Sequence, residues 1–351
     1  MAYTTVDNPE LFFQTKTYSG NSGTNAITFD GSENMQPDWI WIKARNHTYS
    51  HTLFDSVRGM TERLQTDKTD AEDTYGSAAP TANTNGFTLG NGAAINSSSY
   101  NYVSWNWKAG TSFTNDASAT GVGTIDSTGS INTTAGFSII SYSGTGTAGT
   151  IAHGLGSTPK MIIVKVRNFA TNWLVQHGDV ASTKVLYLDA TNAATTDSPF
   201  NDTLPTSSVF SVKTANGINA SGKTYIAYCF AEKKGYSKFF SYEGNSNSDG
   251  TFVHLGFKPA FLMVKPIDDA DNWVMFDNKR HDATNSSVSP YFFYANKNFA
   301  ETTDTKLIDF LSNGFKIRAS GNTVNRSSTF IGMALAESPF VNSNGVPNNG
   351  R

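Results

Sequence analysis

One stretch of this sequence occurs three times, and this repetition constrains the fold more than any other feature. The copies are apolar runs that start at a proline and end at a lysine, Pro37–Lys43, Pro159–Lys165 and Pro259–Lys265. They are separated by intervals of roughly 100 residues, which is a common size for one domain. Repetition at a fixed order indicates similar structural units in tandem.

Further landmarks surround each copy in the same order. A Tyr-x-Gly turn precedes it at residues 18–20, 142–144 and 242–244, and a strand-like closing segment follows at residues 102–107, 225–230 and 330–335. We therefore predict three homologous units over residues 1–108, 136–233 and 234–340. Residues 109–135 are rich in Gly, Ser and Thr and are expected to form a linker or long loop. Residues 341–351 are a C-terminal tail.

The closing segments have the alternation of β-strands. In the first copy Val103, Trp105 and Trp107 share one face, while Ser104 and Asn106 occupy the other. The runs after the prolines are apolar at successive positions, as in central strands covered on both faces. Asn, Gly and Ser punctuate the strands. The sequence predicts an all-β fold of three tandem β-sandwich repeat domains, jelly-roll-like in arrangement.

Composition and motifs exclude several classes of function. The chain has 26 Lys and Arg against 29 Asp and Glu, a net charge of −3, so a basic surface for nucleic acid is not expected. Cys229 is the one cysteine and is expected to be a buried, inert thiol. No window approaches 18 apolar residues and the N-terminus lacks the pattern of a secretion signal, so no membrane insertion is expected. Without a nucleophile elbow or a phosphate-binding loop, we expect no enzyme and no cofactor.

The repeated motifs resemble a known group of proteins. The strand after each proline, the Tyr-Ser-Gly turn, the Asn-Trp strand start and the Ala-Glu ending at residues 231–232 and 336–337 are similar to tandem-repeat virion structural proteins of tailed bacteriophages, notably marine ones. The resemblance covers nearly the whole chain. It implies a tail-fibre-like or spike-like protein of the virion surface, and it brings no catalytic residue with it.

Tryptophans are the first candidates for a binding site, because exposed indoles often stack on sugars. Trp39, Trp41, Trp105 and Trp107 match aliphatic residues, Phe, Tyr or Met in the other copies, which is typical of core positions. Trp173 and Trp273 each start a strand after a polar turn. These last two are the tryptophans offered as binding residues.

An acidic turn is the second candidate. Asp268, Asp269 and Asp271 place several carboxylates in one loop, a chemistry that suits Ca²⁺. The matching turns of the other two copies are not acidic, and the glycine and distal glutamate of an EF-hand are missing. A solvated turn is the preferred interpretation, so these residues stay candidates for binding and no metal site is predicted.

The expected function is that of a bacteriophage virion structural protein, a tail-fibre or spike component that contacts the host surface. A capsid decoration or head-fibre protein is the alternative, and a glycan depolymerase is a third interpretation. Expected partners are other virion proteins of the tail or capsid, a host-surface glycan or protein, and further copies of the chain, with a trimer favoured. The protein would be assembled in the host cytoplasm and end on the virion. The loops expected to bind are residues 45–51, 58–76, 168–172, 189–201, 268–272 and 279–290.

Overall fold

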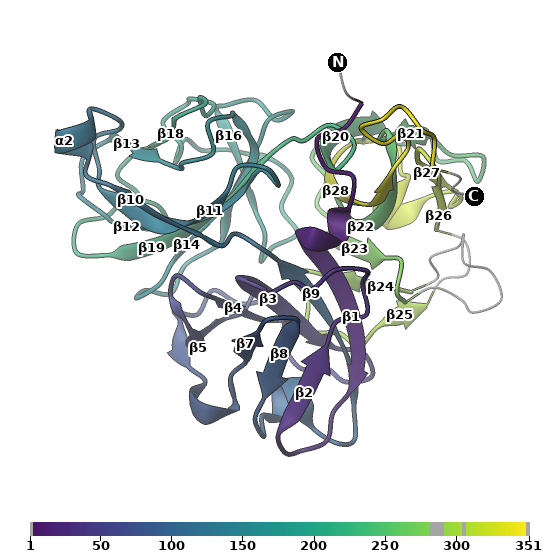
Figure 1. Ribbon diagram of the computed structural model, residues 1–351. Coiled ribbons are helices and arrows are strands. Elements are labelled where there is room, and N and C mark those ends of the chain that lie inside the picture. The colour runs from purple at the N-terminus through teal and green to yellow at the C-terminus, as the bar shows by residue number, and fades with distance from the viewer. Residues whose placement is uncertain (1–2, 281–290, 304–306, 349–351) are drawn as a thin grey trace.

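Strands dominate this computed structural model, which describes residues 3–280, 291–303 and 307–348 (Figure 1). The prediction of an all-β fold is confirmed. The strands gather in three bodies, here called the first unit (residues 9–107), the second unit (residues 111–231) and the third unit (residues 237–339). In Figure 1 the first unit lies at the bottom, the second at the upper left and the third at the upper right.

The regular elements are short. The first unit contains η1 (Pro9–Leu11), β1 (Phe13–Ser19), β2 (Asn25–Thr28), β3 (Trp39–Ala44), β4 (Thr52–Asp55), β5 (Gly59–Leu64), β6 (Asp73–Thr74), η2 (Gly76–Ala78), β7 (Thr81–Asn83), β8 (Gly86–Leu89), α1 (Ala93–Asn96) and β9 (Asn101–Trp107). The second contains β10 (Thr111–Asn115), α2 (Ala117–Thr120), β11 (Ser127–Asn132), β12 (Phe137–Ser143), β13 (Gly149–Ala152), β14 (Pro159–Val166), β15 (Leu174–His177), β16 (Lys184–Tyr187), β17 (Thr195–Thr196), β18 (Val209–Val212) and β19 (Thr224–Ala231). The third contains β20 (Ser237–Glu243), β21 (Phe252–His254), β22 (Phe257–Pro266), β23 (Val274–Asp277), β24 (Tyr291–Tyr294), β25 (Thr302–Thr303), β26 (Ile308–Leu311), β27 (Gly314–Ile317), η3 (Asn322–Val324) and β28 (Thr329–Pro339). Among the described residues, no helix is long and apolar enough to cross a membrane.

The large sheets of the three units have one strand order. It is β1-β9-β3-β4-β5-β6 in the first unit, β12-β19-β14-β15-β16-β17 within the second, and β20-β28-β22-β23-β24-β25 in the third. In each, the closing strand (β9, β19 or β28) pairs antiparallel with the strand that carries the repeated apolar run (β3, β14 or β22). A smaller sheet completes each unit, formed by β2-β8-β7, β13-β18 or β21-β27-β26.

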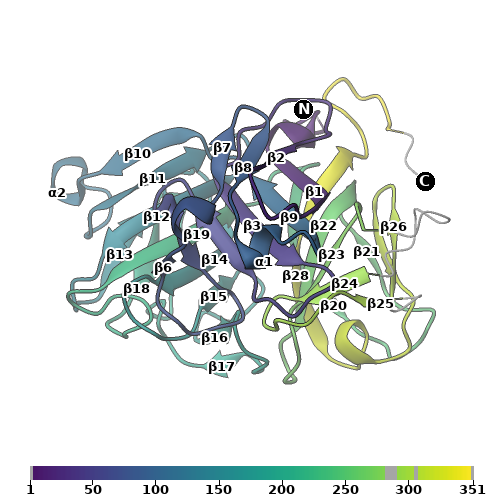
Figure 2. The same cartoon turned by 90° about the horizontal axis from the view of Figure 1, so that it is seen from below.

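Each large sheet separates two cores. On one face it packs against the small sheet of its own unit, as in a β-sandwich; in the second unit Ala227 and Cys229 join Phe210 and Val212 there. The opposite faces of the three closing strands meet in one shared core, to which they contribute Val103, Trp105, Trp107, Ile226, Tyr228, Phe230, Ile331, Met333 and Leu335. The three large sheets therefore surround a common centre, which Figure 2 shows from below. Trp39, Trp41, Trp105 and Trp107 are core residues as predicted, but their core is the shared one.

The segment expected to be a linker is instead part of a sheet. Within residues 109–135, β11 pairs with β12 and β10 pairs with β11, so the large sheet of the second unit has eight strands. The composition of residues 109–135 does not indicate strands, because β10 and β11 bury few apolar side chains. Phe113 and Ile131 pack only partly against the core of the second unit. Backbone pairing, rather than a hydrophobic face, holds this extension.

The Tyr-x-Gly turns owe their repetition to a close backbone approach. In the second unit Asn219 Oδ1 accepts from the amide of Thr145 at 2.8 Å, and its Nδ2 donates to the carbonyl of Thr147 at 2.7 Å. Asn96 and Asn325 hold the other two turns in the same way. The turn lies so close that a Cβ on Gly144 would stand 2.2 Å from the carbonyl oxygen of Ala220.

We expect Gly144→Ala to lower the free energy of unfolding by about 1–3 kcal/mol, the usual cost of overpacking, because backbone must move to admit the methyl group. Gly321→Ala is the matched control, since a Cβ there meets no atom within 4 Å. Urea denaturation of both variants measures the difference. Equal stability of the two variants would contradict the close approach.

Candidate functional site

The two tryptophans offered as binding residues lie between units and are fully buried. Trp173 Nε1, in the second unit, donates to the carbonyl of Gln65 in the first at 3.0 Å. Trp273 Nε1, in the third, donates to the carbonyl of Tyr187 in the second at 2.9 Å. The prediction that these rings stack on a ligand is wrong, because burying an indole with its N–H satisfied stabilises an interface between units.

His51 takes the equivalent position where the first unit meets the third. Burial lowers the pKa of His51 well below its usual range, so the ring is neutral. Trp41 Nε1 donates to Nδ1 at 2.8 Å, which leaves the proton on Nε2, and Nε2 donates to the carbonyl of Tyr294 at 3.0 Å. Ring N–H groups thus bridge all three contacts between units, which we call the 1–2, 2–3 and 3–1 junctions.

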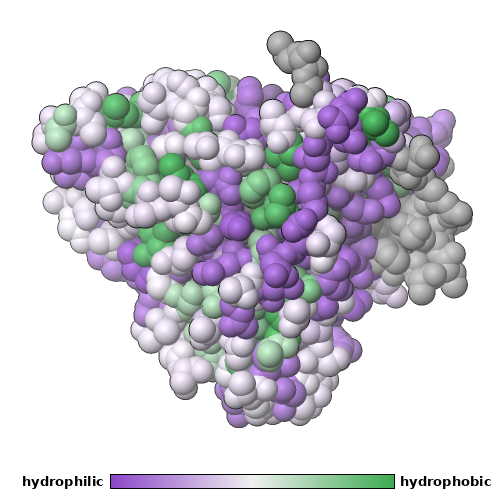
Figure 3. Space-filling model, in the orientation of Figure 1, coloured by the Kyte–Doolittle hydropathy of each residue, from purple (hydrophilic) through white to green (hydrophobic). Residues whose placement is uncertain are grey.

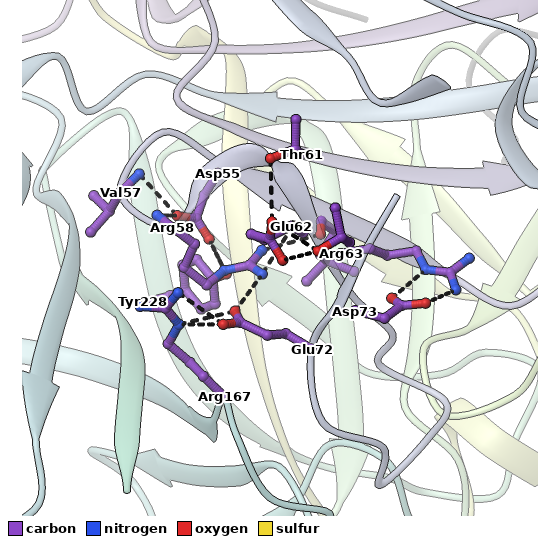
Figure 4. Close-up of polar contacts among 12 residues, drawn as sticks. Asp55, Val57, Arg58, Thr61, Glu62, Arg63, Glu72, Asp73, Arg167 and Tyr228 are labelled. Atoms are coloured by element: carbon purple, nitrogen blue, oxygen red, sulfur yellow. Dashed lines mark hydrogen bonds and ion pairs between the residues drawn. The ribbon is translucent and has the colours of Figure 1, made fainter. Parts of the chain in front are cut away.

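A buried ionic network reinforces the 1–2 junction (Figure 4). Asp55 Oδ2 accepts from the hydroxyl of Tyr228 at 2.7 Å and from Arg58 Nε at 2.6 Å. Glu72 accepts from Arg167 Nε at 2.9 Å and from Arg58 Nη1 at 3.3 Å. The Asp55 and Arg58 side chains are fully buried, and buried charges are tolerated only when they are paired in this way.

The other two junctions vary this theme. The 3–1 junction keeps the network with the equivalent residues Asp277, Arg280, Trp105, Glu301 and Arg45. The 2–3 junction replaces it with His177, Val180, Ala194 and Ile267, and these join or border the shared core. Two junctions are therefore ionic and one is mainly apolar.

Several of the loops expected to bind a host supply these junctions. Residues 45–51 and 58–76 provide Arg45, His51 and Arg58, and residues 189–201 provide Ala194. Their sequences differ between copies because each loop meets a different neighbour. Variation between copies therefore did not identify a free binding surface. Of the loop 279–290, residues 281–290 lie outside the described residues.

The lysines that end the repeated strands are fully buried, namely Lys43, Lys165 and Lys265. Lys165 Nζ donates to the carbonyl of Thr69 in the first unit at 2.8 Å, and Lys265 Nζ donates to the carbonyl of Thr191 in the second at 3.3 Å. Burial lowers the pKa of Lys43 to about 7 and that of Lys165 and Lys265 to about 8. Lys165 and Lys265 thus tie the loop of one unit to the strand of the next, whereas Lys43 Nζ donates to the carbonyls of Ala44 and His47 in its own unit.

The acidic turn in the third unit makes internal contacts. Asp268 Oδ2 accepts from the amide of Thr329 at 3.0 Å, and Asp271 pairs with Arg326. Asp269 belongs to the same turn. Within the part of the chain that the structure describes, no group of three or more His, Cys, Asp or Glu side chains is placed to hold a metal ion. Cys229 is fully buried, and burial raises the pKa of its thiol to about 12.

A groove of about 580 Å³ lies beside the extension of the second unit. Its lining combines hydroxyl, amide and carboxylate groups from β10, β11, β12, the first residue of β19 and the turns next to these strands, namely Thr114, Asn115, Asp116, Thr124, Ile125, Asp126, Ser127, Thr128, Ser141, Tyr142, Ser143, Thr145 and Thr224. Tyr142 is its one aromatic residue and is buried. We call this the hydroxyl groove, and it is the candidate functional site.

Strand register explains why hydroxyls gather there. Thr114 pairs with Thr128, and Thr128 pairs with Ser141, so three hydroxyl side chains lie in one row across three strands. The next row on that face contains Ser143 and its partner Thr224. Hydroxyl groups both donate and accept, so the rows suit a ligand that is itself rich in hydroxyls.

Two carboxylates border the rows. Asp116 Oδ1 caps α2 by accepting from the amides of Ser118 and Ala119 at 3.0 and 3.1 Å, and Asp126 Oδ1 accepts from the amide of Ala117 at 2.8 Å. Hydrogen bonding, first to Ser118, lowers the pKa of Asp116. Among the described residues, neither Oδ2 atom has a hydrogen-bond partner.

Sequence reasoning missed this site because it treated residues 109–135 as a linker. One signal was present: Phe113, Ile125 and Ile131 are apolar residues spaced among Ser and Thr, a weak amphipathic pattern that two paired strands can have. The third copy offers no equivalent segment for comparison.

Comparison with known proteins identifies one family. A family model described as a domain of unknown function, DUF7483, matches residues 8–339, so a single match spans all three units. No curated protein and no solved structure matches the chain.

We expect Tyr228→Phe to lower the free energy of unfolding by about 1.5–3 kcal/mol, because it removes a buried hydrogen bond to the charged Asp55. Tyr236→Phe is the matched control: that ring is also buried in the shared core, and its hydroxyl has no hydrogen-bond partner among the described residues. Chemical denaturation compares the two. If both variants lose the same stability, the Asp55 bond contributes nothing.

The buried lysines predict a pH dependence. In the unfolded chain Lys165 holds its proton up to about pH 10.5. In the folded protein burial lowers the pKa of Lys165 to about 8, and the nearby charges of Asp189 and Asp70 offset this lowering only in part. Between these values the unfolded state binds more protons, so stability rises with pH.

The stability of the wild type relative to Lys165→Met should therefore grow by about 1–3 kcal/mol from pH 8 to pH 10.5. Lys160→Met, which removes an exposed lysine of β14, should show no such trend relative to the wild type. Urea denaturation at several pH values measures both differences. A difference for Lys165→Met that does not change with pH would refute the lowered pKa.

Proposed function

This chain belongs to the family described as a domain of unknown function, DUF7483, and we propose that it is a bacteriophage virion structural protein that contacts the host surface as part of a tail fibre or spike. In this proposal the hydroxyl groove is the contact and a host-surface glycan is its ligand. The repeated motifs, which resemble those of virion proteins, support the proposed place on the virion. The hydroxyl groove supports the proposed contact with a host-surface glycan.

The observation that carries the proposal is the difference between the second unit and the other two. All three units share one order of strands, and several of their variable loops contact a neighbouring unit at the junctions. The extension β10–β11 exists in the second unit alone among the described residues, and the groove is formed around it. A segment that is added to a rigid scaffold and open to solvent is a frequent place for binding residues.

The chemistry of the groove favours binding over cleavage. A glycosidase needs one carboxylic acid that keeps its proton near neutral pH and a second carboxylate that is ionised. Hydrogen bonds from Ser118 and Ala119 lower the pKa of Asp116, which makes it a poor proton donor. Asp116 is therefore unsuited to the role of the acid, and we propose an adhesin rather than a depolymerase.

A capsid decoration protein is the second candidate, and the arrangement of the units favours it. Three sheets with one strand order enclose a common core, so the molecule approximates a three-fold object. Such an object suits a three-fold position of a capsid lattice. Figure 3 shows hydrophobic residues scattered over one face of the molecule rather than gathered in one patch.

We expect labelled protein to bind cells of some strains in a panel of marine bacteria and to leave their polysaccharide intact, because the groove holds hydroxyls without cleaving the chain. Thr128→Trp fills the middle of the hydroxyl row and should reduce cell binding at least tenfold. Thr183→Trp places the same ring on an exposed turn outside the groove and is the control.

Immunogold labelling of phage particles that contain the protein tests its location. Gold on the tail together with cell binding supports the adhesin. Gold on the capsid with no cell binding favours the decoration protein, and shortened polysaccharide after incubation would establish a depolymerase.

A further inference from the structure

The charge of the hydroxyl groove restricts which glycans it can hold. Its lining includes Asp116 and Asp126, and no Lys or Arg is among the lining residues that the structure describes. A sugar carboxylate, sulfate or phosphate in the groove would face two carboxylates without a cation to pair with. Such like-charge contacts, and a desolvated anion without a partner, oppose binding.

Each of these two carboxylates has one oxygen that makes no hydrogen bond to the described part of the protein. Each Oδ1 is already engaged with backbone amides next to α2, whereas each Oδ2 has no partner among the described residues. Both side chains are exposed, so each Oδ2 can accept a hydrogen bond from outside. An ammonium group makes a charge-assisted hydrogen bond to an ionised carboxylate, which is stronger than the bond from a neutral hydroxyl.

Register places these acceptors beside the hydroxyl rows. Asp116 follows the last residue of β10 and Asp126 precedes the first residue of β11, so by alternation both continue the face of Thr114 and Thr128. A sugar lying along the hydroxyls of Thr114 and Thr128 would thus present its substituents to the carboxylates. The hydroxyls suit any sugar, and the carboxylates discriminate among them.

We propose that the hydroxyl groove selects glycans that carry free amino groups, accepts neutral glycans more weakly and rejects acidic ones. This inference rests on the proposed function, because it takes a surface glycan as the ligand. Exposed ion pairs contribute modestly, so selectivity of about 3- to 10-fold for the amino sugar over its neutral counterpart is expected. Screening by salt should reduce this selectivity.

Three tetrasaccharides of equal length test the proposal: a glucosamine tetramer, an N-acetylglucosamine tetramer and a galacturonic acid tetramer. Titration calorimetry or ligand-observed NMR with the full chain, at low salt and at 150 mM salt, gives their relative affinities. We expect the glucosamine tetramer to bind best, the N-acetylated tetramer 3- to 10-fold more weakly and the acidic tetramer not measurably.

Charge-removing variants separate the carboxylates from the rest of the groove. Asp116→Asn and Asp126→Asn keep an oxygen that can accept the backbone amides, and Asn is as good a helix cap as Asp. Each should weaken the glucosamine tetramer about 3-fold and leave the N-acetylated tetramer unchanged. Asp202→Asn removes an equal charge from an exposed turn outside the groove, so it should change neither.

The outcomes distinguish this inference from the proposed function. Equal affinity for all three tetramers, preference for the acidic one, or unchanged selectivity in both variants overturns the inference, and so does the absence of binding to any tetramer by protein that binds cells. Cell binding that Thr128→Trp does not affect overturns the proposed function of the groove. Selective tetramer binding without cell binding supports the sugar class and overturns the adhesin.

Discussion

The shared core between the three large sheets is the interaction on which the rest of the molecule depends. Each unit has a β-sandwich-like core of its own, yet the bulkiest face of its closing strand lies in the shared core; Trp105 and Trp107 of β9, for example, pack against Phe261 of the third unit. Large aromatic side chains dominate core energetics, so a unit in isolation would expose the surface that contributes most to stability. The three units are therefore interdependent, and the junctions have to exclude water from this centre.

The junctions meet this requirement with polar groups that are mostly paired; the exception among them is Arg280 Nη2, which is buried without a hydrogen-bond partner among the described residues. The ring N–H groups of His51, Trp173 and Trp273 each donate to a backbone carbonyl of the neighbouring unit. Hydrogen bonds of this kind fix the position of one unit against another, because an unpaired N–H would be costly in the interior. The ionic networks around Asp55 and Asp277 further fix the orientation of the neighbouring units at the 1–2 and 3–1 junctions. At the third, Val180 shows that apolar packing can replace an arginine.

Much of the fold could be predicted from the sequence, because each repeated motif reflects a local requirement, either burial of a strand or close approach of two backbone segments. The strand that starts at Pro159 is apolar over residues 161–164 since both of its faces are buried there, and Gly144 recurs as Gly20 and Gly244 since each turn approaches backbone too closely for a Cβ. What alternation cannot reveal is which partner covers a face. Trp105 and Cys229 lie on opposite faces of equivalent strands, and only the three-dimensional arrangement shows that one face meets other units and the other its own small sheet.

The candidate site escaped prediction for a related reason. The loops expected to bind differ between copies, but every copy meets a different neighbour, so such differences arise from structure as readily as from binding. Trp173 and Trp273 were candidates because each starts a strand after a polar turn, a position that is buried at a junction in both units. The hydroxyl groove sits where no copy can be compared, on strands β10 and β11 that lack a strong apolar pattern. The repeated parts of the three units are largely used for contacts with one another. The extension β10–β11 of the second unit is not part of the repeat, and its surface stays open for binding.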